Sequence, residues 1–213
     1  MTRLVTFGCS YPYGHGLKDC YNSKDKGYGP TPSNFAFPGL IAQHCNFQDV
    51  NLSRPGISNK GIVHKIMQFD FVKGDICLLA WTHVDRTSQI TKDDDIVFIG
   101  PWQTDSLSKS YYKYFYEHYD NLWNTKLYIN YANLYLKNKG VQVINIQGYN
   151  ASEHIEWKEL VDKDMIMTYE NVHSEPLDRA LDNAHPGEKT HKRFAEYMLV
   201  RYGYILRKNK VEN

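Results

Sequence analysis

The stretch Leu4-Val5-Thr6-Phe7-Gly8-Cys9-Ser10 lies near the N-terminus and decides how the rest of the chain is read. Leu4 to Phe7 is rich in β-branched and aromatic residues, as a buried strand requires, and Gly8 ends the run. In open α/β sheets, ligands bind outside the carboxyl ends of the strands, where loops converge on a crevice. Ser10 is therefore a candidate nucleophile; the alternative is an ordinary Gly-X-Ser turn.

Apolar runs and helical patterns alternate along the rest of the chain. The expected strands are 4–7, 47–52, 76–80, 141–146 and a weak fifth strand at 165–168. The expected helices are 35–45, a second from Ser58 or Asn59 to 71, one long helix or two broken near Asp120 at 108–139, a short one at 155–161, and 188–206. Strands that alternate with helices form a mainly parallel sheet with helices on both faces. The pattern predicts an α/β protein with a three-layer α/β/α sandwich and a five-stranded sheet.

The size of the chain fits one domain spanning residues 1–213, since 213 residues with 42% hydrophobic content can enclose a proper core. Residues 85–108 interrupt the alternation, and we interpret them as an insertion over the site, with a short strand at 96–99. The acidic triplet Asp93-Asp94-Asp95 lacks the spaced ligands of a calcium loop, so a solvated turn is expected.

Charge and composition exclude several classes of function. With 25 basic and 24 acidic residues, no electrostatic footprint for nucleic acid or anionic membrane is expected. No apolar stretch approaches the roughly 20 residues of a membrane span, and no signal-peptide layout opens the chain, which predicts a cytoplasmic protein. The four cysteines show no CxxC spacing, so we expect reduced thiols, no metal cage and no cofactor. A homo-oligomer is compatible with the composition.

The other end of the chain carries Asp182-Asn183-Ala184-His185-Pro186 before a long amphipathic stretch. A serine nucleophile needs an imidazole to accept its proton and a carboxylate to hold that imidazole in the right tautomer. On one short loop, Asp182 and His185 can turn toward each other, which supplies both groups. The alternative is a helix cap with an incidental histidine.

Together the two ends resemble the SGNH, or GDSL-type, hydrolases, a family of esterases and lipases with a flavodoxin-like fold. Gly8-Cys9-Ser10 matches the family's Gly-Asp-Ser block, with cysteine in place of aspartate. Asn51-Leu52-Ser53-Arg54-Pro55-Gly56 matches its second block, in which a glycine N–H helps to form the oxyanion hole. The resemblance implies a triad of Ser10, His185 and Asp182, with Gly56 as an oxyanion donor.

The third block departs from the family, because Trp81-Thr82-His83-Val84-Asp85-Arg86 stands where Gly-x-Asn-Asp is usual. This Trp-Thr-x-x-x-Arg pattern resembles a divergent branch of the same family. Losing an oxyanion donor costs about two to three orders of magnitude in rate, so a replacement matters. Thr82, His83 and Asn59 are the candidate donors, and Arg86 is a candidate to orient Asp182 or to hold an anionic group of the substrate.

The resemblance and the aromatic residues after Ser10 favour hydrolysis of small O-acyl esters, above all acetyl esters, on carbohydrate. Three alternatives remain open: an acyltransferase with the same triad, a weakly catalytic carbohydrate-binding or structural protein, and a metal hydrolase using His83, Asp85, Asp182 and His185. Cys9 is an alternative nucleophile. His15 is expected to be a surface loop residue, and Gln147 or Asn150 to touch the substrate.

Overall fold

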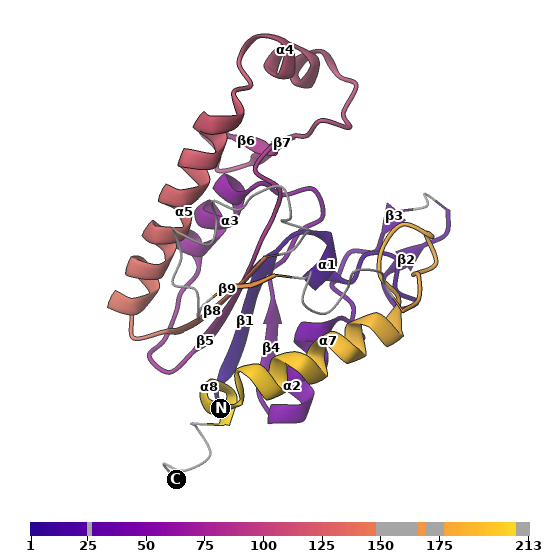
Figure 1. The fold of residues 1–213 in the computed structure, drawn as a ribbon, viewed down its shortest axis with the longest axis vertical. Helices are drawn as coiled ribbons and strands as arrows, with labels where there is room; N and C mark the ends of the chain where they lie inside the picture. The colour runs from indigo at the N-terminus through magenta and orange to yellow at the C-terminus, as the bar shows by residue number, and fades with distance from the viewer. Residues whose placement is uncertain (25–26, 148–165, 169–176, 208–213) are drawn as a thin grey trace.

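The computed structural model describes residues 1–24, 27–147, 166–168 and 177–207. Its centre is a five-stranded parallel sheet in the order β4-β1-β5-β8-β9 (Figure 1). In that order the strands span Gln48–Asn51, Arg3–Gly8, Ile76–Trp81, Gln142–Gln147 and Ile166–Thr168. Counted along the chain the order is 2-1-3-4-5, the flavodoxin-like arrangement. The predicted five-stranded parallel sheet is confirmed.

Helices cover both faces of this sheet, as Figure 1 shows. One face packs against α2 (Phe37–Cys45), α7 (Glu188–Arg201) and α8 (Gly203–Arg207). The other packs against α3 (Asn59–Gln68) and α5 (His118–Asn138). Neighbouring residues of β1 enter different cores, Leu4 with the first group and Val5 with the second, because side chains alternate across a strand. The predicted three-layer sandwich is therefore confirmed.

The central strand β5 is buried along its whole length. It ends on Trp81, whose indole Nε1–H donates to Asn145 Oδ1 of β8 at 2.9 Å. The Asn145 amide in turn donates to Asn133 Oδ1 of α5 at 2.9 Å. This hydrogen-bonded chain links β5, β8 and α5 just below the carboxyl edge of the sheet.

Replacing Trp81 with phenylalanine should lower the free energy of unfolding by about 1–3 kcal/mol, because Asn145 Oδ1 loses its buried donor. Urea unfolding measures this change. Trp123→Phe on the exposed side of α5 is the matched control and should stay within about 0.5 kcal/mol of wild type. Equal effects of the two substitutions would contradict this role for the indole.

Several predicted helix boundaries are wrong, and the neighbouring side chains explain two of them. The first helix begins at Phe37 rather than Phe35, because the Ser33 hydroxyl accepts from the Phe35 amide in a turn before the helix. The second predicted helix, α3, starts as expected with Ser58 as its cap, but it ends at Gln68 rather than at Phe71. The following chain turns inward so that the Phe71 ring packs on the sheet.

The two long predicted helices are each divided. The stretch 108–139 forms α4 (Ser106–Tyr114) and α5, with the break at 115–117, earlier than expected. The stretch 188–206 forms α7 and α8, interrupted at the buried Tyr202. In the described part of the chain, none of the helices is long and apolar enough to cross a bilayer.

The segment 85–108 contains a hairpin of β6 (Thr87–Ile90) and β7 (Ile96–Ile99), of which sequence patterning found only the second strand. The Thr91 hydroxyl accepts from the amides of Asp93 and Asp95, which makes the acidic triplet a tight, exposed turn. A second small hairpin pairs β2 (Tyr21–Asn22) with β3 (Gly27–Tyr28). The expected helix at 155–161, the Gln147 side chain and Asn150 lie outside what the structure describes.

Candidate active site

Ser10 lies where β1 passes into the four-residue helix α1 (Ser10–Tyr13), at the carboxyl edge of the sheet. The chain turns sharply here because Gly8 has no side chain: a Cβ at this position would lie 2.5 Å from Pro12 Cγ and 2.8 Å from Ala80 Cβ. Ser10 itself is 8% exposed. The preceding Cys9 packs in the core that faces α3 and α5, so its thiol is an unfavourable nucleophile.

After α1 the chain makes a turn through Gly14-His15-Gly16. Both glycines have positive φ, +76° and +87°, a conformation that L residues with a side chain rarely adopt. The His15 amide donates to the Ser10 carbonyl at 3.0 Å, and the Gly16 carbonyl accepts from the Leu181 amide at 2.9 Å. The turn therefore connects the candidate nucleophile to the C-terminal loop.

That loop closes on itself around Asp182. Asp182 Oδ1 accepts from the backbone amides of Ala184 and His185, both at 3.0 Å. Its Oδ2 lies 2.6 Å from His185 Nδ1. The Asp-x-x-His spacing thus brings carboxylate and imidazole together, as the sequence predicts. Pro186 and Gly187 follow at the start of α7, which fixes the end of the loop.

The electrostatics keep Asp182 charged. Burial would raise the pKa of this carboxyl, but the hydrogen bonds from His185 and Ala184 outweigh burial, and the net pKa is lowered. An ionised carboxylate only accepts hydrogen bonds, so His185 Nδ1 carries the hydrogen between them. His185 Nε2 is then the nitrogen that can accept a proton.

Two residues beside Ser10 meet the His185 ring. The Tyr11 ring contacts it edge-on with centroids 5.9 Å apart, and the His15 ring stacks on it at 4.3 Å and 21°. His15 Nε2 also lies 3.8 Å from Asp182 Oδ2. These contacts bring the N-terminal turn and the C-terminal loop, about 170 residues apart in sequence, to one corner of the carboxyl edge.

The expectation that His15 is a surface loop residue is wrong. The side chain is half-buried and packs between Tyr28 and His185. Sequence reasoning missed it because a histidine among tyrosines and glycines has no partner at a recognisable spacing. The two flanking glycines were the available signal, since they mark a tight backbone approach.

Gly16→Ala tests how closely the turn and the loop approach. A Cβ at Gly16 would lie 2.7 Å from Asp182 Cγ, so clash adds to backbone strain. We expect the free energy of unfolding to fall by about 2–4 kcal/mol in urea denaturation. Gly74 has a similar φ of +95° with nothing within 4 Å of a Cβ, so Gly74→Ala should cost only the strain, about 1–2 kcal/mol. Equal losses would contradict the close approach.

The second block runs alongside the end of β1. The Leu52 and Arg54 amides donate to the Thr6 and Gly8 carbonyls, both at 2.8 Å. Gly56 follows with φ +81°, and a Cβ at this position would lie 3.8 Å from the Phe98 ring and 3.9 Å from the Trp102 ring of the inserted segment. The insertion therefore reaches the loop that carries the candidate oxyanion glycine.

Two of the candidate oxyanion donors, Asn59 and Thr82, make hydrogen bonds within the protein. Asn59 is buried: its amide hydrogens go to the Thr82 carbonyl at 3.0 Å and Thr125 Oγ1 at 3.4 Å, while its oxygen accepts from the Thr82 amide at 2.8 Å. The Thr82 hydroxyl accepts from Arg86 at 2.9 Å. The Asn59 side chain is thus held by internal hydrogen bonds, although the residue also lines a polar pocket together with Arg86. The amide, carbonyl and hydroxyl of the fully buried Thr82 are likewise engaged in internal hydrogen bonds.

Arg86 and His83 lie on the half-buried part of this block. The Arg86 guanidinium stacks on Trp102 with its carbon 4.7 Å from the ring centroid. Among the described residues the buried Arg86 Nε has no hydrogen-bond partner, and the residue lines a polar pocket of about 220 Å³ between α3 and α5. Asp182 accepts from two backbone amides. A role for Arg86 in orienting Asp182 or in holding an anionic group stays a prediction.

One group of possible metal ligands exists in the described part of the chain. His15, Asp182 and His185 each offer a donor atom, all within 4.8 Å of one another, whereas His83 and Asp85 do not join them. The 2.6 Å contact of His185 Nδ1 with Asp182 has the length of a charge-assisted hydrogen bond. The four-residue metal site considered from the sequence is therefore not assembled among the described residues.

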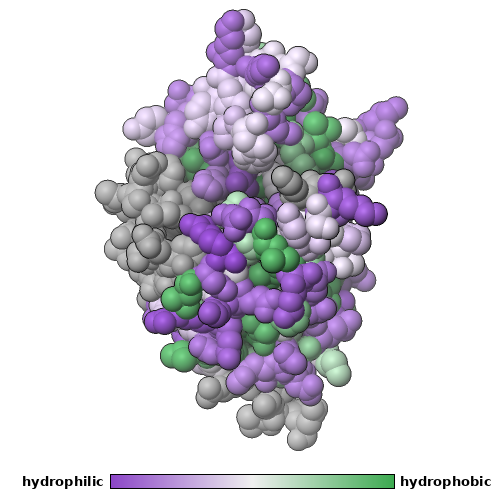
Figure 2. Space-filling view, turned by 90° about the vertical axis from the view of Figure 1, so that its right-hand side faces the viewer, coloured by the Kyte–Doolittle hydropathy of each residue, from purple (hydrophilic) through white to green (hydrophobic). Residues whose placement is uncertain are grey.

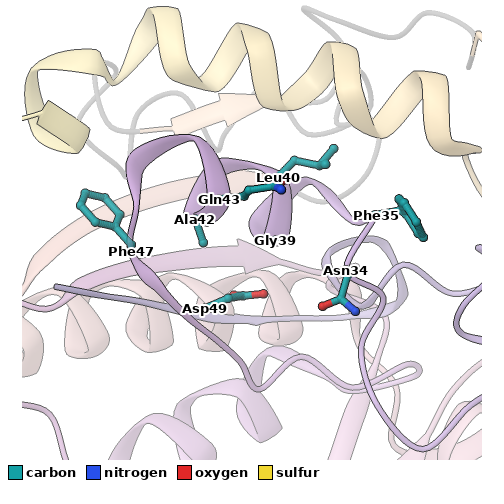
Figure 3. Close-up of a pocket in the computed structure, with 8 residues that line it drawn as sticks. All are labelled: Asn34, Phe35, Gly39, Leu40, Ala42, Gln43, Phe47 and Asp49. Atoms are coloured by element: carbon teal, nitrogen blue, oxygen red, sulfur yellow. The ribbon is translucent and has the colours of Figure 1, made fainter. Parts of the chain in front are cut away.

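A separate pocket of about 430 Å³ lies beside α2 and β4 (Figure 3). Its lining comes from Asn34, Phe35, Gly39, Leu40, Ala42, Gln43, Phe47 and Asp49. None of these residues belongs to the cluster around Ser10 and His185, so this pocket plays no part in the chemistry considered below.

Comparison with solved structures gives the fold its context. No protein-family model and no curated protein matches the sequence. A lipolytic protein of the G-D-S-L family from Desulfitobacterium hafniense aligns over 94% of this chain and 99% of its own, with a TM-score of 0.57 and 12% identity. The chain has the SGNH/GDSL-type hydrolase fold.

Two further structures share this SGNH fold. An acetyl xylan esterase from the rumen bacterium Butyrivibrio proteoclasticus aligns over 95% of this chain and 65% of its own, with a TM-score of 0.55 and 12% identity. An esterase from Pseudoalteromonas, described as inhibited by monoethylphosphonate, aligns over 96% and 99%, with a TM-score of 0.53 and 9% identity. The SGNH fold predicted from the sequence is confirmed. At these identities the similarity concerns the fold.

Proposed function

We propose that this SGNH-fold protein is a serine esterase that hydrolyses small O-acyl esters, above all acetyl esters on carbohydrate. The observation that carries the proposal is the Asp182–His185 hydrogen bond of 2.6 Å, on a loop held against the turn of Ser10. The fold is shared with esterases, one of them an acetyl xylan esterase.

In the proposed reaction, Ser10 Oγ attacks the ester carbonyl while its proton passes to His185 Nε2. The new imidazolium is stabilised by Asp182 through Nδ1–H. The amide N–H groups of Ser10 and Gly56 stabilise the oxyanion. His185 then gives the proton to the leaving alkoxide. Water hydrolyses the acyl-serine by the same two proton transfers, releasing the acid and restoring Ser10.

Aromatic rings beside His185 and His15 support a carbohydrate substrate. Tyr11 lies against His185 and Tyr28 against His15, and the flat rings of these two tyrosines can stack on a sugar. The face of the molecule that Figure 2 shows is largely hydrophilic, and its hydrophobic residues form small separate patches. A polar surface with aromatic rings suits an acetylated sugar better than a long acyl chain.

The test is a chain-length series of aryl esters together with acetylated xylan. Acetate should be the preferred acyl group, and acetic acid should be released from the polysaccharide. Preference for octanoate would contradict the substrate class, and absence of hydrolysis from a folded protein would contradict the esterase. Transfer of acetyl to an added sugar, in place of release of acetic acid, would point to the acyltransferase.

A further inference from the structure

The His15 side chain has contacts that the proposed triad does not require. Its ring stacks on His185 at 4.3 Å, its Nε2 lies 3.8 Å from Asp182 Oδ2, and its other neighbour is the Tyr28 ring, met edge-on at 5.3 Å. The ring is thus enclosed between β3 and the C-terminal loop. The His15 imidazole can therefore affect the orientation of the His185 imidazole.

Backbone hydrogen bonds on both sides of His15 hold its turn in place. The amide of His15 is bonded to the Ser10 carbonyl, and Gly16 bonds to Leu181, next to Asp182. Gly14 and Gly16 take positive φ values, which aim the ring back over the C-terminal loop. Each end of the turn is therefore tied to a member of the triad or to its neighbour.

The orientation of His185 needs more than one hydrogen bond. A single bond at Nδ1 leaves the imidazole free to tilt about that contact, and its Nε2 then moves relative to Ser10. Tyr11 contacts the ring edge-on, and His15 covers one face. A misplacement of about 1 Å at a reacting group can cost about a hundredfold in rate.

We propose that His15 is a positioning residue, which holds the His185 imidazole by stacking so that Nδ1 stays on Asp182 while Nε2 stays available to Ser10. This inference rests on the proposed function and extends it to a residue outside the triad. The stacked ring acts through His185 and does not touch the substrate carbonyl.

The titratable groups that face His15 are His185, Asp182 and Tyr28. Burial and the nearby His185 lower the pKa of His15, although Asp182 opposes this. The lowered pKa favours the uncharged His15 ring, the form that stacks on His185 without charge repulsion.

The experiment compares His15→Ala, which removes the ring, with His15→Phe, which keeps a flat ring without charge. We expect His15→Ala to lower kcat for aryl acetate about tenfold to a hundredfold with little change in KM. His15→Phe should recover kcat to within about threefold of wild type. His44→Phe, at an exposed position of α2, is the matched control and should leave kcat and KM unchanged.

A spectroscopic readout separates this inference from the proposed function. The downfield proton resonance of the Nδ1–H bond between His185 and Asp182 should persist in wild type and His15→Phe and broaden in His15→Ala, whatever the activity. Persistence in all three proteins, or equal kcat losses in both variants, would overturn the positioning role. A wild type that hydrolyses no ester, or a Ser10→Ala variant as active as wild type, would instead overturn the proposed function.

Discussion

Ser10→Ala should lower kcat for aryl acetate hydrolysis by about five to six orders of magnitude, because the acyl-enzyme route is lost with the hydroxyl. His185→Ala should cost about as much, since Ser10 then has no base. The double variant should be no worse than either single one, because nucleophile and base act as one unit. Initial-rate kinetics on purified proteins measure all three.

Ser106→Ala is the matched control for this prediction. Ser106 is exposed at the first position of α4, away from the triad, and its loss should leave kcat unchanged. Circular dichroism should show that all variants are folded. A Ser10→Ala protein that keeps more than about a tenth of wild-type kcat would contradict a serine nucleophile.

Asp182→Asn is the second large effect, an expected fall in kcat of about four orders of magnitude. The carboxylate accepts from His185 Nδ1–H and so leaves Nε2 unprotonated. An asparagine amide can donate to Nδ1 instead, which puts the hydrogen on Nε2, where it faces Ser10. His185 then cannot accept the serine proton, although the loop keeps its shape.

Asp178→Asn is the control, because Asp178 is also a hydrogen-bonded carboxylate on this loop. It accepts from the Lys189 and Thr190 amides at the start of α7, so its replacement should reduce stability but change kcat less than about threefold. Equal losses of kcat in the two variants would show that loop structure, and not the His185 tautomer, explains the effect.

The pH dependence of the wild type follows from the same carboxylate. The lowered pKa of Asp182 means that its charge is present above the ordinary aspartate range and is lost only as the pH falls through the lowered folded value. Asp182 therefore stays ionised across the range in which histidine titrates. Asp182 should therefore contribute nothing to the acid limb of kcat above about pH 5.

The fold could be predicted because the residue pattern within each main strand and helix indicates that element. Leu4 to Phe7 and Ile76 to Ala80 are apolar runs that only a strand buried on both faces explains. β6 was not predicted because its polar sequence has no apolar strand pattern. The strand is held instead by its pairing with β7 and by the Ser58–Ser88 hydrogen bond. Tertiary contacts of this kind leave no periodic pattern.

In the candidate site, too, contacts between residues close in sequence could be predicted and contacts between distant residues could not. Asp182 and His185 could be paired from sequence because they lie three positions apart on one loop. The roles of Asn59 and His15 could not be derived, since Asn59 serves the distant Thr82 and His15 meets a ring 170 positions away. Such contacts exist only after the sheet has assembled its loops at one edge.

The most direct test of the central claim is reaction of the wild-type protein with a fluorophosphonate, followed by peptide mapping of the adduct by mass spectrometry. We expect one adduct, on Ser10, formed by wild type and strongly reduced in His185→Ala. An adduct on Cys9, or no adduct on a folded protein that hydrolyses esters, would contradict Ser10 as the nucleophile.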